Sequence, residues 1–178
     1  MRAAEEQAYT EYVSARLPWI RRVAYLLCQD WHRADDLVQA AITKLYVHWG
    51  RARAADHIDA YARTVLVHEF IGERRSAWAR RVRLDGQLTR ASTGETSDHD
   101  ALLDLRAALA AVPPRQRATL VLRFYCDLNV EQAAQVLGCS PGIVKSQTVK
   151  GLAALRRALN PAPDPGPRSA GERRTHHG

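Results

Sequence analysis

Apolar residues recur every three or four positions along most of this chain, which is the spacing that places side chains on one face of an α-helix. The pattern predicts helices from about Glu5 to Cys28, from Ala34 to Trp49 and from His57 to Trp78. Pro18 lies within the first helix and is expected to kink or split it, because proline lacks a backbone N–H donor. Gly50 is expected to end the second helix. The strict apolar–polar alternation that is typical of strands is absent.

Two stretches without apolar anchors divide the chain. Residues 91–100 read ASTGETSDHD, a small, polar and acidic composition that predicts a linker. The residues after Asn160 read PAPDPGPRSAGERRTHHG, which predicts a disordered tail. The predicted fold is all-α, with two small helical domains joined by a flexible linker. The expected ranges are a first domain at 5–80, an acidic linker at 81–100, a second domain at 101–159 and a tail at 160–178.

The helical pattern of the second half is interrupted once before its strongest motif. It resumes after the linker with apolar positions at Leu102, Leu105, Leu109 and Val112. Pro113 and Pro114 then break it. A further helix is expected beyond them, with Leu120, Val121 and Phe124 facing inward.

The strongest local signals lie between residues 129 and 141. Asn129 is a favourable helix N-cap, and Gln132 stands three residues later, as in a capping box. Gly138 follows the short helix that these residues begin, at a position suited to a left-handed backbone. Ser140 is a second N-cap, and Pro141 takes the first helical position, where a missing N–H is harmless. Two short helices joined by a tight turn form the helix-turn-helix pattern, which reads duplex DNA.

The second of these helices has two different faces. The side expected to pack on the first helix carries Val144, Thr148, Leu152, Leu155 and Leu159. The opposite side carries Gly142, Ser146, Val149, Lys150 and Arg157, flanked by Lys145 and Gln147. Val149 is either a scattered surface valine or a contact to a thymine methyl group, and the sequence leaves both open. Gly142 fits a close approach of the backbone to a phosphate group.

Charge favours a polyanionic partner. Lysine and arginine number 26 against 19 acidic residues, a net charge of +7 that suits nucleic acid or an anionic membrane surface. No apolar run is long enough to span a bilayer, and the polar N-terminus MRAAEEQAYTEY does not read as a signal peptide. Cys28, Cys126 and Cys139 are odd in number and lack paired spacing, so we expect ordinary thiols in a reducing cytoplasm.

A basic run follows the third predicted helix. It consists of Arg74, Arg75, Arg80, Arg81 and Arg83. Such a run suits contact with phosphates, with an affinity that falls as salt rises. Trp78 lies among these arginines, and the sequence leaves open whether it stacks on bases or belongs to the core.

The sequence contains no recognisable catalytic motif. His32, Asp35 and Asp36 lie close together near the start of the second predicted helix, where capping is a simpler role for carboxylates than a metal site. Glycine-rich phosphate loops and nucleophile elbows are absent. We therefore expect no enzyme activity, no cofactor and no metal.

Four tracts, taken together, resemble one known family. They read GCSPGIVKSQTVKGLAALR, PPRQRATLVLRFYCDLNVEQAAQVL, ADDLVQAAITKLYVHW and DAYARTVLVHEFIGERR. They resemble segments of the extracytoplasmic-function sigma factors of bacterial RNA polymerase. The first tract resembles the part of these proteins that reads the −35 promoter element, and the second resembles the segment that precedes it in the same domain. The third resembles the helix that docks on the β′ clamp of the polymerase, and the fourth resembles the segment that handles the −10 element. The resemblance covers roughly Tyr9 to Leu159. It implies a subunit that binds core polymerase and directs promoter-specific transcription initiation.

The resemblance also implies roles for individual residues. The residues at the positions where family members contact the −35 element are Arg123, Lys145, Ser146, Val149 and Lys150. In the segment that handles −10 DNA stand Arg63, His68, Arg74 and Arg75, and the loop near Arg51–Asp59 would capture a flipped base. On the docking helix stand Asp35, Asp36, Leu37 and Gln39. The implied partners are core RNA polymerase, through its β′ clamp and β flap, and promoter DNA. An anti-sigma factor is a further class of partner. The resemblance implies that the protein acts in the cytoplasm and has no membrane partner.

Two other classes of protein could carry the same helix-turn-helix. A dimeric transcriptional regulator that is not a polymerase subunit would need a dimer interface and a palindromic site. A structural adaptor would bind polymerase without promoter selectivity. The predicted helix Ala34–Trp49 favours the sigma factor, because a conventional regulator would more often carry a ligand pocket or a dimerisation helix there.

Overall fold

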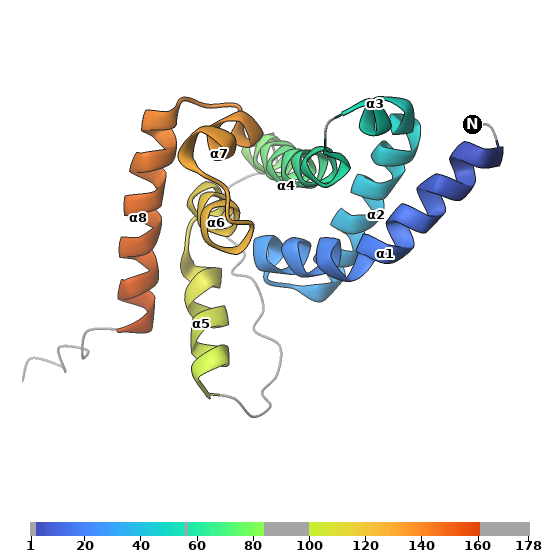
Figure 1. The fold of residues 1–178 in the computed structure, drawn as a ribbon. Coiled ribbons are helices and arrows are strands. Elements are labelled where there is room, and N and C mark those ends of the chain that lie inside the picture. The colour runs from blue at the N-terminus through green and yellow to red at the C-terminus, as the bar shows by residue number, and fades with distance from the viewer. Residues whose placement is uncertain (1–2, 56, 84–99, 161–178) are drawn as a thin grey trace, which may run out of the picture.

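The computed structural model describes residues 3–55, 57–83 and 100–160, and within these all side chains except those of 74–83 and 100–104. Its regular elements are all helical, as predicted (Figure 1). They are α1 (Ala3–Cys28), α2 (Trp31–Val47), α3 (Trp49–Ala54), α4 (Ile58–Arg83), α5 (Asp100–Ala111), α6 (Pro114–Leu120), the π-helical turn η1 (Val121–Tyr125), α7 (Val130–Leu137) and α8 (Pro141–Leu159). The acidic stretch at 91–99 and the residues after Asn160, for which a linker and a tail were predicted, lie outside the described residues.

Helix α1 contains Pro18 and is not split by it. Its ribbon changes direction along its length in Figure 1, as expected where a proline removes a backbone hydrogen bond. The buried residues of α1 lie after the proline and include Ile20, Val23 and Leu27. The C-terminal half of α1 is therefore the part that anchors it to the core.

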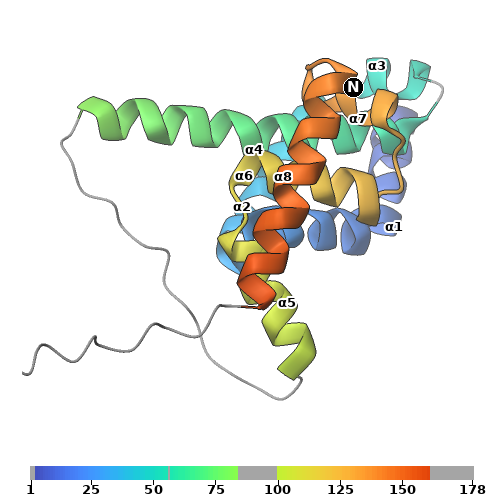
Figure 2. The same cartoon turned by 90° about the vertical axis from the view of Figure 1, so that its left-hand side faces the viewer.

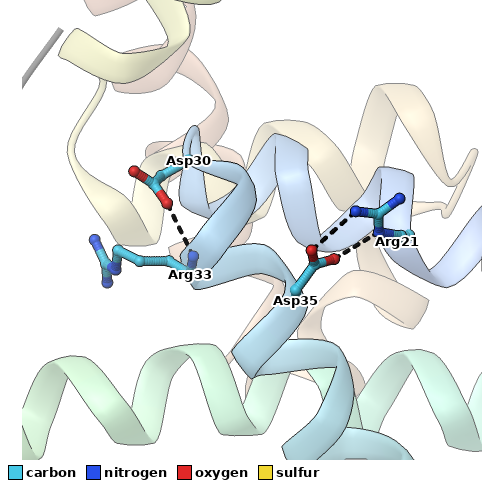
Figure 3. Close-up of polar contacts among 4 residues, drawn as sticks. All are labelled: Arg21, Asp30, Arg33 and Asp35. Atoms are coloured by element: carbon cyan, nitrogen blue, oxygen red, sulfur yellow. Dashed lines mark hydrogen bonds and ion pairs between the residues drawn. The ribbon is translucent and has the colours of Figure 1, made fainter. Parts of the chain in front are cut away.

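Helix α2 begins earlier than the apolar pattern predicted. Asp30 is its N-cap, and the Asp30 carboxylate accepts a hydrogen bond from the Arg33 N–H at 2.9 Å (Figure 3). The capping role expected for Asp35 and Asp36 is wrong, because both stand in the second turn, beyond the free N–H groups. These carboxylates are thus available for other partners.

The predicted stop at Gly50 is also wrong. Helix α2 ends at Val47, and Gly50 lies inside α3. The short α3 is held by burial of its Trp49 and Ala52 side chains. The Trp49 ring packs against the rings of Tyr9 and Tyr12, with centroids 5.4 and 5.6 Å apart. This aromatic contact outweighs the low helix propensity of one glycine.

The N-terminal and C-terminal halves share one hydrophobic core. A single cluster of buried side chains takes members from α1, α2 and α4 and also from α6, η1, α7 and α8. Fully buried members include Leu27 of α1, Leu37 of α2, Phe70 of α4, Leu122 of η1 and Val144 of α8. Helical periodicity placed Leu27, Leu37 and Val144 on inward faces, but it did not single out Phe70 or Leu122, and it does not specify which helix any of them meets.

Arg117 of α6 joins the two halves through buried hydrogen bonds. It is 4% exposed, and its guanidinium donates to the carbonyl of Leu27 in α1 at 2.8 Å. It also donates to the carbonyls of Ala110 and Val112, at 2.9 and 3.0 Å. A guanidinium is tolerated in a protein interior only when its N–H groups find acceptors, and the backbone supplies them here.

The turn η1 changes the register of the helix that follows the two prolines. The Cys126 N–H donates to the Val121 carbonyl at 2.9 Å, which spans five residues instead of four. Phe124, which was expected to face inward, is consequently 61% exposed, while Leu120 and Val121 are buried as expected. The prediction for Phe124 is wrong because it assumed a regular α-helical period.

Two further leucines predicted to face inward are exposed. Leu105 is 40% exposed and Leu159 is 41% exposed. Leu105 lies in the first half of α5 and Leu159 ends α8, and these parts of the two helices lie below the other labelled helices in Figure 1. The described part of the structure leaves both leucines partly exposed there.

Candidate nucleic-acid interface

The helix-turn-helix has the local structure that its sequence predicted. The Gln132 N–H donates to the Asn129 side chain at 2.8 Å, and the Asn129 N–H donates to the Gln132 side chain at 2.9 Å, which completes the capping box. Gly138 has a φ of 62°, in the left-handed region that favours glycine. The Ser140 hydroxyl accepts from the Ile143 N–H at 3.4 Å, and Pro141 opens α8. These signals are local, and local sequence was sufficient to find them.

Helix α8 presents the predicted basic face to solvent. Val144 is fully buried, whereas Val149 is 69% exposed. Lys145, Ser146 and Lys150 are also exposed. Figure 2 looks onto α8, which lies in front of the other helices. The structure therefore brings four of the five predicted −35 residues onto one open surface.

Gly151 is a structural residue of α8 that the sequence reasoning missed. It is buried in the middle of the inward face. A Cβ at this position would lie 3.1 Å from Cγ of Leu120 in α6. Its position within the apolar stripe of α8 was the available signal. The close approach of α8 to α6 depends on the missing side chain.

Arg123, the fifth predicted −35 residue, lies apart from that surface. It belongs to η1 and is half-buried. Its guanidinium donates to the Leu128 carbonyl, which closes the loop before α7. In this conformation Arg123 supports the start of the helix-turn-helix.

The predicted −10 residues of α4 contact the C-terminal half. His68 Nε2 donates to the Val136 carbonyl of α7 at 2.8 Å. Burial raises the pKa of the Cys126 thiol, and the nearby Arg63 of α4 lowers it in part. Arg74 and Arg75 continue along α4, which extends beyond the other helices in Figure 2, and their side chains lie outside the described part of the structure.

The predicted docking residues of α2 separate into exposed and buried members. Asp36 and Gln39 are exposed and Asp35 is half-buried. Leu37 is fully buried in the shared core, so it supports α2 and has no surface with which to contact a partner. The sequence placed all four on one helix but did not separate its faces.

Asp35 is held by an arginine of α1 (Figure 3). Arg21 Nε and Nη2 donate to the two carboxylate oxygens at 2.5 and 2.8 Å. The pKa of Asp35 is consequently held below its usual value, chiefly by this hydrogen bond. Asp35 is therefore an ionised carboxylate that is already paired at the surface of the molecule.

The segment near Arg51–Asp59, expected to be a loop that captures a flipped base, is largely helical: Arg51 lies in α3 and Asp59 in the first turn of α4, which is tied to α1. Asp59 accepts a hydrogen bond from the Tyr12 hydroxyl at 2.9 Å and pairs with Arg16 at 2.7 Å. Burial and the Asp59 carboxylate raise the pKa of Tyr12, so Tyr12 stays protonated and remains a donor. The contact fixes the start of α4, the helix that carries the −10 candidates.

Metal-binding and membrane-spanning features were searched for in the described residues only. There, no group of three histidine, cysteine or acidic side chains is placed to hold a metal ion. No helix within the described ranges has the length and apolar character that crossing a bilayer would require.

Comparisons with known proteins agree with this arrangement. Residues 12–80 match the family described as Sigma-70 region 2, and residues 102–155 match Sigma-70, region 4. An RNA polymerase sigma-E factor from Streptomyces avermitilis is 33% identical over 167 residues, which cover 89% of each chain. The ECF RNA polymerase sigma factor EcfG from Rhodopseudomonas palustris is 28% identical over 150 residues, covering 83% of this chain and 82% of that one.

A solved structure has a similar fold. It is the sigma factor RpoE from Bartonella quintana, in complex with the anti-sigma factor NepR. The TM-score is 0.72 at 23% identity, over 86% of this chain and 97% of that chain.

Proposed function

The chain belongs to the extracytoplasmic-function sigma factors, and on that premise we propose which of its surfaces contact core RNA polymerase and promoter DNA. As a sigma factor it binds core polymerase and directs transcription initiation from promoters. The presence of both Sigma-70 regions in one chain carries this conclusion. A dimeric regulator outside polymerase is not favoured, because it would have no use for region 2. Core polymerase supplies the nucleotide chemistry, so the chain itself is no enzyme and acts in the cytoplasm.

The exposed face of α8 is proposed to read the −35 element. Lys145, Ser146, Val149 and Lys150 share one open side of a helix whose first turn is exposed, which suits entry into the major groove. Exposure of Val149 fits contact with a thymine methyl group better than a packing role. Arg123 would join this surface only if it left the Leu128 carbonyl, and we propose that it orients α7 and α8.

The side of α4 that carries Arg63 and His68 is proposed to bind the −10 element, together with Arg74 and Arg75 further along the helix. Arginine and histidine side chains can donate to both phosphates and base edges. The tie between Asp59 and Tyr12 supports this proposal, because it fixes the start of the helix and hence the direction of these side chains.

The start of α2 is proposed to dock on the β′ clamp through Asp35, Asp36 and Gln39. The partner surface would be basic, since it meets two carboxylates. Asp35 can exchange Arg21 for a cation of the partner without changing its ionisation. The β flap is a second proposed contact, made by the C-terminal half.

An anti-sigma factor is a further proposed partner. The similar RpoE chain was solved with NepR, and a regulator that binds both halves would keep this chain from core polymerase. Co-purification of the chain with its neighbours in the cell would test this partner class.

Run-off transcription is the experiment that tests the proposed function. The chain is added to core polymerase with a library of promoter templates, and another sigma factor verifies that the core is active. A transcript that starts at a defined site and depends on the added chain is expected. If active core gives no such transcript from any template, the proposed function is wrong.

The docking proposal has its own test. The double variant Asp35→Asn, Asp36→Asn should bind core polymerase roughly three- to ten-fold more weakly, because two charge pairs at the interface are lost. Glu6→Gln removes an acidic charge from an exposed residue of α1 and is the control. Surface plasmon resonance on immobilised core would measure the affinities. Equal affinity of the double variant and the wild type would contradict the assignment.

A further inference from the structure

Lysine is rare in this chain, and its few positions are not scattered. Of the 26 lysines and arginines, only Lys44, Lys145 and Lys150 are lysines. Lys145 and Lys150 lie on the outward side of α8, one turn before and one residue after the exposed Val149. The two residue types differ in chemistry, because a lysine amine can lose its proton and attack an acyl carbon, whereas a guanidinium stays protonated. The proposed −35 face therefore carries two of the three side-chain amines in the sequence.

The two amines of α8 have no carboxylate close to them along the chain. Residues 141–159 contain no aspartate or glutamate. Both lysines are exposed, and within the described part of the structure neither forms an ion pair. Each amine is thus surrounded by solvent, and no contact within the described residues has to break before it reacts.

Lys44 of α2 has a different environment. Its ammonium donates to the Glu69 carboxylate of α4 at 2.5 Å. The Glu69 side chain is only 18% exposed, so its carboxylate is poorly hydrated and depends on this charge. Acylation of Lys44 would break the ion pair, and this cost should slow its reaction. Lys44 is therefore an internal reference for the amines of α8.

The cations that hold the fold together are arginines. Arg117 donates to three backbone carbonyls, and Arg21 pairs with Asp35. These guanidinium groups do not react with a reagent that acylates amines. Acylation of the α8 lysines would therefore change the proposed −35 face and leave these structural contacts in place.

We propose that Lys145 and Lys150 are sites of Nε-acylation by a small acyl phosphate, and that this modification switches off −35 reading. The proposal rests on the function assigned above to α8. In the reaction the neutral amine attacks the carbonyl carbon of the donor and an N–C bond forms. The C–O bond to the phosphate group breaks, inorganic phosphate leaves, and one proton of the amine passes to water. A neutral amide then replaces each ammonium.

The surface of α8 suits this class of donor. The helix has four basic residues and no acidic one, and it lies in front of the other helices in Figure 2. Its positive field attracts an anionic reagent such as an acyl phosphate. Because the donor is already activated, it can react on an open helix face without the pocket of an acyltransferase.

Loss of the two charges has a defined effect on DNA binding. A neutral amide cannot pair with a phosphate group as an ammonium does, and it has fewer hydrogens to donate to a guanine edge. The −35 affinity should fall roughly ten-fold or more. The slope of log affinity against log salt should become smaller by about one for each of these lysines that contacts a phosphate.

Treatment with acetyl phosphate tests the inference on the full-length chain. Peptide mass spectrometry follows the three lysines with time, and Lys145 and Lys150 should be acetylated several-fold faster than Lys44. Fluorescence anisotropy measures binding of a −35 duplex from a promoter that the chain transcribes, before and after treatment. Circular dichroism should be the same before and after, because the fold does not depend on these amines.

Two variants are the controls. Lys44→Arg has no lysine outside α8, so treatment should weaken its −35 binding as in wild type and leave its affinity for core polymerase unchanged. The double variant Lys145→Arg, Lys150→Arg keeps both charges and has no amine on α8. Its −35 affinity, whatever the starting value, should be the same before and after treatment, which excludes acetylation of the N-terminus as the cause.

The outcomes separate this inference from the proposed function. The inference is wrong, while promoter-dependent transcription stands, if neither α8 lysine reacts faster than Lys44. It is equally wrong if the doubly acetylated chain binds the −35 duplex as tightly as the untreated chain. If the untreated chain binds no −35 duplex and transcribes from no promoter, the proposed function is wrong and the inference fails with it.

Discussion

Arginine side chains in this chain have different partners, although the sequence shows them only as basic residues. Arg21 donates to the Asp35 carboxylate at the surface, whereas the buried Arg117 donates to three backbone carbonyls. Arg123 was expected at DNA and donates to the Leu128 carbonyl. The net charge predicts a polyanionic partner for the whole molecule, but the role of each arginine depends on the acceptors within its reach.

Gly142 gives a prediction that separates folding from DNA binding. A Cβ at Gly142 would meet only the Ser140 hydroxyl oxygen, at 3.9 Å, which is an ordinary contact. Gly142→Ala should therefore raise the free energy of unfolding by up to about 1 kcal/mol, because alanine favours the helix. If the backbone approaches a phosphate here, the variant should bind all −35 sequences more weakly, since phosphate contacts carry no sequence information.

The measurement pairs urea unfolding with −35 binding. Lys150→Ala is the comparison. If Lys150 contacts a base, this variant should lose roughly 1–3 kcal/mol of binding free energy, and only at the base pair that Lys150 reads. Unchanged binding by Gly142→Ala would show that its backbone is not close to DNA.

At the scale of elements, short-range hydrogen bonds decide where helices begin, and packing decides how they continue. The caps at Asn129 and Ser140 are formed as their sequence predicts. The π-helical turn η1 and the inclusion of Gly50 in α3 are not signalled locally. Both place buried side chains, Leu122 and Trp49, where other helices meet them.

The contact between α8 and α6 gives a prediction at this scale. Gly151→Val should lower the free energy of unfolding by about 1–3 kcal/mol, because the new side chain would overlap the buried Leu120. Leu120→Ala in the same chain should recover part of the loss by making room. Thermal unfolding followed by circular dichroism measures both variants. A double variant less stable than the sum of the single changes would contradict this packing.

At the scale of the whole molecule, the shared core makes two sequence-defined domains one structural unit in this conformation. The ranges that match region 2 and region 4 contribute buried side chains to the same cluster. Trp19, Trp31, Trp49 and Trp78 all lie in the N-terminal half. Tryptophan fluorescence therefore reports on that half, and circular dichroism on all helices.

Replacing Arg117 tests whether the two halves unfold as one unit. In wild type, urea should unfold the chain in one transition with the same midpoint by fluorescence and by circular dichroism. Arg117→Leu should lower that midpoint in both signals and reduce the free energy of unfolding by about 2–4 kcal/mol, because three backbone carbonyls lose the buried guanidinium that donates to them. Arg115→Leu is the exposed control. An effect of Arg117→Leu confined to the circular dichroism signal would mean that the halves unfold separately.

The sequence by itself determined the features that depend on neighbours along the chain. These are the all-α class, the capped helix-turn-helix, the outward face of α8 and the family resemblance. The first three arise from hydrogen bonds or side-chain periodicity within a few residues, and the resemblance depends on the order of residues alone, so the sequence specifies all four directly.

Only the tertiary structure decided which residues meet across the chain. It exposed Phe124, which periodicity had placed inward. It placed Arg117 on Leu27 and joined His68 to Val136. These contacts join residues far apart in sequence or depend on a register change, and periodicity indicates that a side chain faces inward without indicating what it packs against. The packing of the two halves around one core is therefore a property of the folded molecule.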